Sequence, residues 1–176
     1  MNDKLLLIKN AIRDVPDFPK KGIIFKDITT ALKQPEIFKT VSEELTNQFK
    51  NKGITKVAAI EARGFILGSI LAYNLDAGFV PLRKPGKLPA PSYSYTYELE
   101  YGTDSIEVHK DAFDEKDVVL LHDDLLATGG TTIAGIELIK KFNVKEIFIS
   151  YFIELTFLEG RKRIGEDFEL YSLINY

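Results

Sequence analysis

The sequence predicts an α/β fold in which helices flank a central, mostly parallel sheet. Short runs rich in β-branched and aromatic residues recur along the chain and indicate buried strands, and helical patterns separate them. Strands that alternate with helices are typical of parallel sheets joined by right-handed crossovers, so we expect about four or five core strands. The 176 residues suffice for one domain with its own hydrophobic core.

The individual elements follow from local patterns. Strands are expected at residues 57–60, 79–82, 118–121 and 147–153. Pro35 is a good first-turn residue, and the apolar residues after it recur every fourth position through Phe49, so this helix should turn one stripe toward the sheet. Further helices are expected at 64–73 and 131–142, the second ending near Asn143.

Two regions break this alternation. Residues 13–30 hold two prolines and a glycine around a short apolar run, which predicts an extended segment rather than a regular element. Residues 84–107 hold three prolines, two glycines and the aromatic stretch Tyr93, Tyr95 and Tyr97. This second region predicts a hairpin or mobile flap that turns at Gly102.

Composition limits the function. With 45% hydrophobic and 28% charged residues the chain is ordinary for a soluble globular protein, and a formal net charge of -3 offers no broad attraction for nucleic acid. The absence of cysteine excludes disulfides, thiolate metal sites and thiol nucleophiles, and it fits a reducing compartment. The apolar run Leu5–Ile8 is too short for a signal peptide, and no segment approaches membrane-spanning length. We expect a cytoplasmic protein that binds neither nucleic acid nor membrane.

The most informative stretch is VVLLHDDLLATGGTT, residues 118–132. Ligands of parallel sheets bind beyond the carboxyl ends of the strands, where this order of residues places Asp123 and Asp124. The small residues of the turn at 127–131 let backbone N–H groups approach an anion at a helix N-terminus, and Thr128 and Thr131 add hydroxyl donors. A phosphate site beside two carboxylates that accept hydrogen bonds from sugar hydroxyls suits a ribose 5-phosphate.

A simpler alternative is that the two aspartates cap a helix and the glycines only turn the chain. The ordered combination of two carboxylates, two glycines and two threonines favours the phosphate site. Other nucleotide motifs are missing, because the chain contains neither G-x-x-x-x-G-K-[ST] nor G-x-G-x-x-G. Their absence disfavours kinases and dehydrogenases.

The segment DDLLATGGT resembles the phosphoribosyl pyrophosphate signature of type I phosphoribosyltransferases. The resemblance implies a parallel sheet flanked by helices under a smaller hood, here a single domain with a hood at about 1–34, a core at about 35–176 and a flap at about 84–107. It implies that Asp123 and Asp124 hold the ribose hydroxyls. The 5-phosphate would be held by the loop residues Ala127, Thr128, Gly129, Gly130 and Thr131.

Two basic segments suit a diphosphate. EARGF resembles the pyrophosphate loop of adenine phosphoribosyltransferases, which implies binding by Ala62, Arg63 and Gly64 and a cis peptide before the arginine, at Glu61–Ala62. RKPGKLPAP follows a predicted strand, and its near-complete family pattern implies pyrophosphate contacts from Arg83, Lys84 and Lys87. Taken without the resemblance, the first segment is a surface arginine after a strand and the second a solvated charged face.

The resemblance also supplies the residues around the base. In LEYG, it implies that Glu100 manages the purine proton and that Tyr101 helps to close the flap, which would exclude water from the reacting sugar. The segment RDVPDFPKKGIIFKDIT resembles the adenine branch of the family. Phe25 would stack on adenine while the backbone near Ile24 and Lys26 pairs with the base edge; the alternative is that these residues fill a small hood core.

Together these resemblances imply purine salvage, in which a glycosyltransferase converts adenine and phosphoribosyl pyrophosphate to AMP and pyrophosphate. They also imply Mg²⁺, held mainly by substrate oxygens and water because the chain lacks a dedicated ligand cluster, and a homodimer. Lys26 stands where the family often has arginine, and His122, where it is usually apolar, receives no role, nor does His109. The rival interpretations are a phosphoribosyltransferase for guanine, hypoxanthine or xanthine, and a non-catalytic regulator of transcription, for which the chain lacks a basic stripe.

Overall fold

The computed structural model describes residues 3–98 and 102–176, except for the Glu98 side chain. By its internal contacts the chain separates into two compact units, residues 1–44 and 45–176. The boundary falls within helix α3 (Pro35–Phe49), which begins at the proline that the sequence marks as a first-turn residue.

The first unit is a small antiparallel hairpin with helices on either side of it in the sequence. Strands β1 (Arg13–Pro16) and β2 (Ile24–Asp27) pair with each other, preceded by α1 (Asp3–Ala11) and followed by α2 (Thr29–Leu32). The expectation of an irregular extended segment at 13–30 was therefore wrong. Pro16 is the last residue of β1 and Pro19 lies in the turn, so the interior of the paired strands keeps its donors, and Gly22 supplies a positive φ of 88°.

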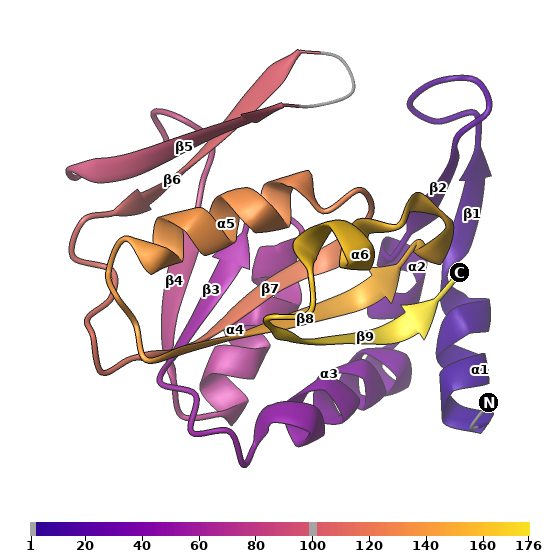
Figure 1. Ribbon diagram of the computed structural model, residues 1–176. Coiled ribbons are helices and arrows are strands. Elements are labelled where there is room, and N and C mark those ends of the chain that lie inside the picture. Colours follow the sequence, from indigo (N-terminus) through magenta and orange to yellow (C-terminus); the bar gives the residue numbers. More distant parts are fainter. Residues whose placement is uncertain (1–2, 99–101) are drawn as a thin grey trace. The chain divides into compact units, whose positions relative to one another are not determined.

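The second unit is built on a five-stranded sheet, in the order β4-β3-β7-β8-β9, in which every neighbouring pair is parallel (Figure 1). The bounds of its strands are β3 (Lys56–Ile60), β4 (Gly78–Leu82), β7 (Val118–Leu126), β8 (Glu146–Glu154) and β9 (Glu169–Asn175). The predicted α/β class with a parallel sheet is confirmed. Strand β9 was missed because its seven residues include charged and polar ones and only two of them are buried.

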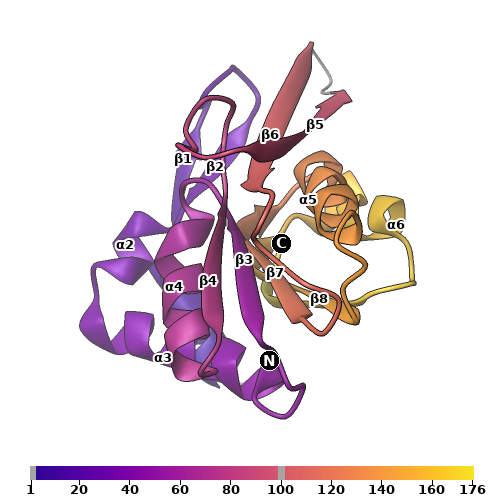
Figure 2. The same ribbon diagram turned by 90° about the vertical axis from the view of Figure 1, so that its left-hand side faces the viewer.

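Helices cover both faces of this sheet. Helix α4 (Gly64–Asn74) lies on one face, and α5 (Gly130–Lys140) and the short α6 (Gly160–Ile164) lie on the other (Figure 2). A 3₁₀ turn at Thr156–Leu158 precedes α6. The core between the sheet and α5 is a continuous cluster of buried apolar side chains, among them Val119, Leu121, Ile136 and Ile149. Burial of these residues fixes the carboxyl ends of the strands relative to the start of α5.

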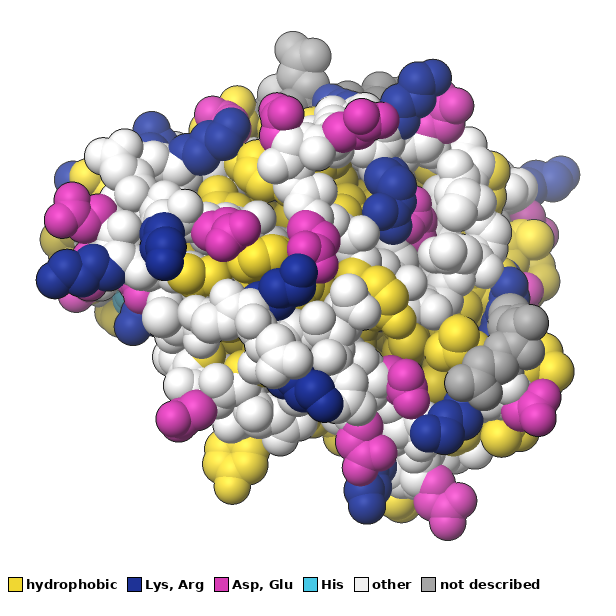
Figure 3. All heavy atoms as spheres, turned by 60° about the horizontal axis from the view of Figure 1, so that its bottom comes forward, with side chains coloured by type: hydrophobic (Ala, Val, Ile, Leu, Met, Phe, Trp, Pro, Cys, Tyr) yellow, Lys and Arg dark blue, Asp and Glu magenta, His cyan; other side chains and the backbone are white. Residues whose placement is uncertain are grey.

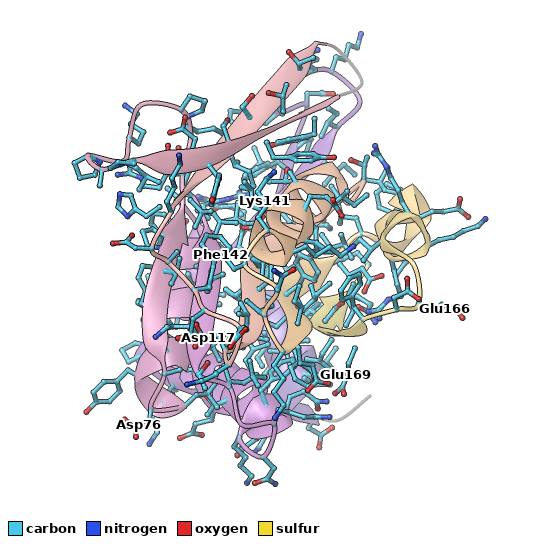
Figure 4. All side chains as sticks on the ribbon, turned by 60° about the vertical axis from the view of Figure 1, so that its left-hand side comes forward. Asp76, Asp117, Lys141, Phe142, Glu166 and Glu169 are labelled. Atoms are coloured by element: carbon cyan, nitrogen blue, oxygen red, sulfur yellow. The ribbon has the colours of Figure 1, made fainter. Side chains whose placement is uncertain are left out.

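The proline- and tyrosine-rich region forms the predicted hairpin. Strands β5 (Ser92–Glu98) and β6 (Thr103–His109) pair antiparallel, and the residues at its base join the core cluster on α5. Phe142, just beyond the C-terminal end of α5 (Figure 4), contacts the ring of Tyr93 at 5.5 Å and that of Phe113 at 5.2 Å between centroids. These edge-on aromatic contacts fix the base of the hairpin to the core.

A side-chain hydrogen bond holds the amino end of β7, at the edge of the sheet away from the predicted site. Asp117 precedes the amino end of β7 (Figure 4) and accepts a 2.6 Å hydrogen bond from the Thr55 hydroxyl.

On the face of the molecule shown in Figure 3, acidic and basic side chains are interspersed. None of the helices within 3–98 and 102–176 combines the length and apolarity needed to cross a bilayer.

Candidate active site

The predicted phosphate loop joins the end of β7 to the start of α5. Gly129 takes a positive φ of 82°, a left-handed conformation that glycine adopts without strain, and it directly precedes the first helical residue, Gly130. The loop residues 127–131 line a cavity of about 70 Å³ together with Asp123. A helix N-terminus with small residues around a narrow cavity is suited to an anion such as a phosphate.

Hydrogen bonds connect the first turn of α5 to strand β8 of the sheet and to strand β5 of the hairpin. The Thr132 hydroxyl and the Tyr151 phenol of β8 are hydrogen-bonded, and both side chains are buried. The Thr131 hydroxyl donates to the Tyr97 phenol of β5 at 3.1 Å. The loop is therefore connected to the sheet on one side and to the hairpin on the other.

Asp123 and Asp124 lie within β7 rather than beyond its end. The strand was predicted to stop at Leu121, but pairing with β8 continues through Asp123 to Leu126, so that prediction was wrong by five residues. Alternation along the strand directs the two side chains differently. Asp123 is half-buried, whereas Asp124 is 3% exposed.

Both carboxyl groups resist ionisation. Burial raises the pKa of Asp123 well above its usual value, and the charge of Asp124 adds to the increase, while burial raises the pKa of Asp124 against the opposing charge of Arg63. The Asp124 amide donates to Asp123 Oδ1 at 2.8 Å. The pair can thus offer acceptor oxygens to sugar hydroxyls without carrying two full negative charges.

The EARGF segment forms the turn between β3 and α4, beside these carboxyl groups. Arg63 precedes Gly64, the first residue of α4, and its Nε lies 2.9 Å from Asp124 Oδ2. The Glu61–Ala62 peptide bond is cis, which confirms that expectation. Arg63 and Asp123 also line a second cavity, of about 190 Å³, which reaches the hairpin residues Tyr97 and Asp104.

The second basic segment follows β4 and is tied to the hairpin. The backbone groups of Arg83 and Glu107 exchange two hydrogen bonds, of 2.9 and 2.7 Å, and the Glu107 carboxylate accepts from the Gly86 amide. The Arg83 side chain donates to Glu61 at 2.9 Å. Lys84 lines the same 190 Å³ cavity as Arg63, whereas Lys87 is exposed. The structure thus brings Arg63 and Lys84 together but leaves Lys87 on the surface.

Helix α6 supports the phosphate loop from the side. A Cβ atom added at Gly160 would lie 2.2 Å from the Ala127 carbonyl oxygen, and one at Gly129 would lie 2.9 Å from the Gly160 carbonyl oxygen. The two glycines therefore allow the backbones of α6 and the loop to approach each other closely.

An ion pair between exposed Arg161 and buried Glu154 anchors this helix to the sheet. Arg161 donates from Nε to Glu154 Oε1 at 3.1 Å and from Nη2 to Oε2 at 2.6 Å, and Ser172 of β9 also donates to Glu154. Burial alone would raise the pKa of Glu154, but the bonds from Arg161 and Ser172 outweigh burial and lower it. A larger cavity, of about 570 Å³, opens beside Arg161 and extends to Glu166 (Figure 4), but it contains none of the predicted site residues.

His122 is buried within β7 next to the aspartate pair. Its side chain is 0% exposed, and its Nδ1 lies 2.8 Å from the Ser150 hydroxyl of β8. Burial lowers the pKa of His122 to about 3. The imidazole is therefore neutral near pH 7 and links two strands of the sheet.

In the first unit, the predicted base-binding residues lie on β2. Ile24 is exposed, Phe25 is half-buried and contacts the Phe18 ring at 5.2 Å, and the other edge of β2 pairs with no strand in the described part of the chain. Lys26 is 9% exposed, and its Nζ lies 2.7 Å from Asp14 Oδ1. Its ammonium is thus directed to the neighbouring strand.

Asp27 holds the end of this hairpin. It accepts from the Thr29 amide and hydroxyl at 2.9 and 2.7 Å and from Arg13 at 2.5 Å. The hydrogen bond from the Thr29 hydroxyl, followed by that from Arg13, lowers the pKa of Asp27 to about 2. The DIT sequence at 27–29 therefore caps the start of α2 and closes the hairpin.

Comparisons with known proteins agree with this geometry. The family profile of the Phosphoribosyl transferase domain matches residues 28–167. An adenine phosphoribosyltransferase of Bacteroides thetaiotaomicron is 53% identical over 171 residues, which cover 97% of each chain. The chain belongs to the adenine phosphoribosyltransferase family.

Solved structures of adenine phosphoribosyltransferases have the same fold. That of the Thermoanaerobacter pseudethanolicus enzyme matches with a TM-score of 0.93 at 51% identity, covering 98% of this chain and 99% of that one. The Giardia lamblia enzyme, solved in complex with 9-deazaadenine, matches with a TM-score of 0.93 at 45% identity, covering 98% and 97% of the two chains. The resemblance stated from the sequence motifs is thereby confirmed at the level of family and fold.

Not every predicted residue of this adenine phosphoribosyltransferase family member can be placed. Glu100 and Tyr101 lie outside the described residues. Conversely, sequence reasoning missed Tyr97 and Asp104, which line the cavity, and Arg161, which anchors α6. The ELT motif at 154–156 was part of the family resemblance, but nothing in the sequence showed that Glu154 would be buried and paired with an arginine seven residues later.

Proposed function

We propose that this chain transfers the phosphoribosyl group of phosphoribosyl pyrophosphate to adenine, giving AMP and pyrophosphate in purine salvage. The observation that carries the proposal is the phosphate loop at the start of α5, next to the carboxyl groups of Asp123 and Asp124 and the cations Arg63 and Lys84. This arrangement suits a sugar that carries one phosphate at its 5-position and a diphosphate at its anomeric carbon. Family membership points to adenine as the acceptor.

In this proposal each part of the site holds one part of the donor. Backbone amides and hydroxyls of residues 127–131 bind the 5-phosphate, and Asp123 and Asp124 accept hydrogen bonds from the ribose hydroxyls. Pyrophosphate binds at Ala62, Arg63, Gly64, Arg83, Lys84 and Lys87. Holding both ends of the donor fixes the anomeric carbon between them, which lowers the entropic part of the barrier.

The reaction is a displacement at that carbon. The N9–C1 bond forms, the bond from C1 to the pyrophosphate oxygen breaks, and the electron pair leaves with pyrophosphate while N9 loses its proton. Arg63 and the lysines stabilise the negative charge on the leaving group, an effect that is large where water is excluded. We propose Glu100 as the group that manages the purine proton and Tyr101 as part of the closing flap, both on family resemblance.

We also propose that Mg²⁺ takes part, bound mainly through the donor. Within residues 3–98 and 102–176, no group of three or more histidine, aspartate or glutamate side chains is arranged to hold a metal ion. Mg²⁺ prefers octahedral oxygen ligands and retains water, so diphosphate and ribose oxygens are suitable partners. Asp123 and Asp124 would hold the sugar and the solvent around such an ion, and the ion would add positive charge on the leaving group.

Adenine would be recognised by the first unit. Phe25 offers an aromatic face, and the backbone near Ile24 and Lys26 would pair with the amino group and ring nitrogens. The Lys26 side chain, engaged with Asp14, is not needed in this scheme. Backbone recognition favours adenine because its donor and acceptor order differs from that of hypoxanthine or guanine.

We further propose a homodimer and a cytoplasmic location. The family supports the dimer, and so do apolar side chains on α4 and β4: Ile66, Tyr73 and Phe79 are 41%, 87% and 39% exposed. Ile66 and Tyr73 lie seven residues apart and so share one side of α4. Light scattering of the purified protein tests the dimer. The cysteine-free composition fits a reducing compartment.

The double variant Asp123→Asn, Asp124→Asn tests the sugar-site assignment. Amides keep the shape of the carboxyl groups but lose acceptor strength, so we expect AMP formation to fall by about two orders of magnitude or more while the fold is retained. Pyrophosphate release measures turnover, and far-UV circular dichroism measures the fold. Near-normal turnover in the folded double variant contradicts the assignment.

A further inference from the structure

Three of the cations proposed to bind pyrophosphate are already paired with carboxylates of the same chain. Arg63 lies 2.9 Å from Asp124, and Arg83 lies 2.9 Å from Glu61. The third pair joins Lys84 to Asp104. An anionic substrate that uses these cations must therefore replace or share their carboxylate partners.

Asp104 differs from the other two carboxylates in its origin. Asp124 belongs to the proposed sugar site, and Glu61 belongs to the EARGF turn between β3 and α4. Asp104, in contrast, is the second residue of β6, in the hairpin. Its side chain nevertheless lines the same cavity as Lys84, Asp123 and Asp124. The hairpin thus inserts a carboxylate into a cavity that is proposed to bind an anion.

Asp104 is held firmly in place. Besides Lys84, the Tyr97 phenol donates to its Oδ2 at 3.1 Å, and the Ser105 amide donates to its Oδ1 at 2.8 Å. Burial alone would raise the pKa of Asp104, but the hydrogen bonds from Lys84, the Ser105 amide and Tyr97 outweigh burial and lower it. The carboxylate is therefore ionised at neutral pH.

Because the cavity has few cations, the charge of Asp104 affects how strongly the cavity attracts a diphosphate. Its lining holds four carboxyl groups, Glu61, Asp104, Asp123 and Asp124, and two cations, Arg63 and Lys84. Asp123 and Asp124 resist ionisation, whereas Asp104 is charged and contacts Lys84, so the cavity attracts a diphosphate less than it would if Lys84 were not paired with Asp104. Of the four carboxyl groups, Asp104 alone combines direct contact with Lys84 and no assigned role in binding substrate.

We infer that Asp104 is an internal counterion of Lys84 that competes with the diphosphate of the substrate, and so sets the affinity for phosphoribosyl pyrophosphate and for the pyrophosphate product. When the diphosphate binds, Lys84 turns from Asp104 to the phosphate oxygens. When pyrophosphate leaves, the ion pair between Lys84 and Asp104 forms again, which favours release of the product. The inference rests on the proposed function and adds a residue that determines affinity.

The substitution Asp104→Asn tests the inference because it removes the charge and keeps the shape. Loss of one negative charge at contact distance from Lys84 should lower the KM for phosphoribosyl pyrophosphate about 3- to 10-fold and tighten pyrophosphate binding by a similar factor. The KM for adenine should change less than twofold, a split that general damage to the fold would not produce. The gain should shrink as ionic strength rises.

Two matched variants control for other effects. Asp104→Glu keeps the charge, so its KM for the donor should stay close to that of the wild type. Asp111→Asn makes the same change in net charge at an exposed position that does not line the cavity, and it should leave both KM values unchanged. Thermal unfolding verifies that all three variants are folded.

Isothermal titration calorimetry measures the binding of Mg²⁺–phosphoribosyl pyrophosphate and of pyrophosphate to the wild type and to Asp104→Asn. These dissociation constants separate this inference from the proposed function. Donor binding that is equal or weaker in Asp104→Asn than in the wild type overturns the inference, because Asp104 would then orient Lys84 rather than restrain it. A wild-type protein that binds the donor but makes no AMP contradicts the proposed function alone. A wild-type protein that binds neither diphosphate contradicts both.

Discussion

Substitution of Gly160 by alanine should displace the phosphate loop without touching any substrate. The added Cβ would lie 2.2 Å from the Ala127 carbonyl oxygen and 2.9 Å from Leu126 Cδ1. A carbon and a carbonyl oxygen normally stay about 3.3 Å or more apart, so the backbones must separate by about 1 Å. Because the nearest atom is a backbone oxygen, no side-chain rotation relieves the overlap.

The magnitude follows from two opposing effects. Forced overpacking of this kind costs typically about 1–3 kcal/mol, whereas alanine gains about 0.4–1 kcal/mol from its less flexible unfolded chain. We therefore expect a net loss of about 1–2 kcal/mol in the free energy of unfolding. A displacement of about 1 Å at a positioning loop costs up to about 100-fold in rate, so kcat/KM for the donor should fall by about 10- to 100-fold.

Steady-state kinetics with varied phosphoribosyl pyrophosphate and with varied adenine measure this effect, and urea unfolding measures stability. Gly78→Ala is the matched control, because its Cβ would meet only the flexible side chain of Lys56, at 3.0 Å. If Gly160→Ala is folded and its kcat/KM for the donor equals that of Gly78→Ala, α6 does not support the phosphate loop and the reasoning is refuted.

Three further predictions follow from single side chains. Burial lowers the pKa of His122 from 6.5 to about 3, so as the pH falls the unfolded chain binds this proton before the folded chain does. Between pH 7 and pH 5 the free energy of unfolding of the wild type should therefore fall by about 2 kcal/mol more than that of His122→Gln. Equal pH slopes in urea titrations of the two proteins would contradict this. Phe25→Ala should raise the KM for adenine about tenfold and leave that for the donor unchanged; equal changes in both KM values would exclude selective stacking. Glu154→Gln should weaken the fork with Arg161, lower stability by about 1–2 kcal/mol and raise the KM for the donor; an unchanged melting temperature would show that the pair adds nothing.

The sequence predicted those parts of the fold that depend on local patterns. Buried parallel strands appear as continuous apolar runs, and Pro35 marks the beginning of α3, so both were predictable; α5 ends at Lys140, three residues before Asn143, where the sequence placed its end. Strand β9 was not, because it mixes polar with apolar residues and depends on β8 for its pairing. The continuation of β7 through Asp123 was missed for a related reason: carboxylates suggest a loop, but pairing with β8 outweighs their low strand propensity.

The same distinction applies to the site. The phosphate loop was predictable because backbone amides at a helix N-terminus need small residues in a fixed order, and that order is visible at 127–131. Asp104 and Tyr97 were not, because their importance arises from pairing across the hairpin and with Lys84, twenty residues away from Asp104. Gly160 was missed likewise, since its contact with Ala127 spans distant parts of the chain. Residues that support a site through tertiary contact leave little local signal.

The most direct test of the central claim is a competition among bases. The wild-type protein is incubated with phosphoribosyl pyrophosphate, Mg²⁺ and equal amounts of adenine, hypoxanthine and guanine, and the nucleotides are identified by chromatography. We predict that AMP forms with stoichiometric pyrophosphate and far exceeds IMP and GMP. A predominance of IMP or GMP, or the absence of any nucleotide product, would contradict the assignment of this chain as an enzyme that makes AMP from adenine.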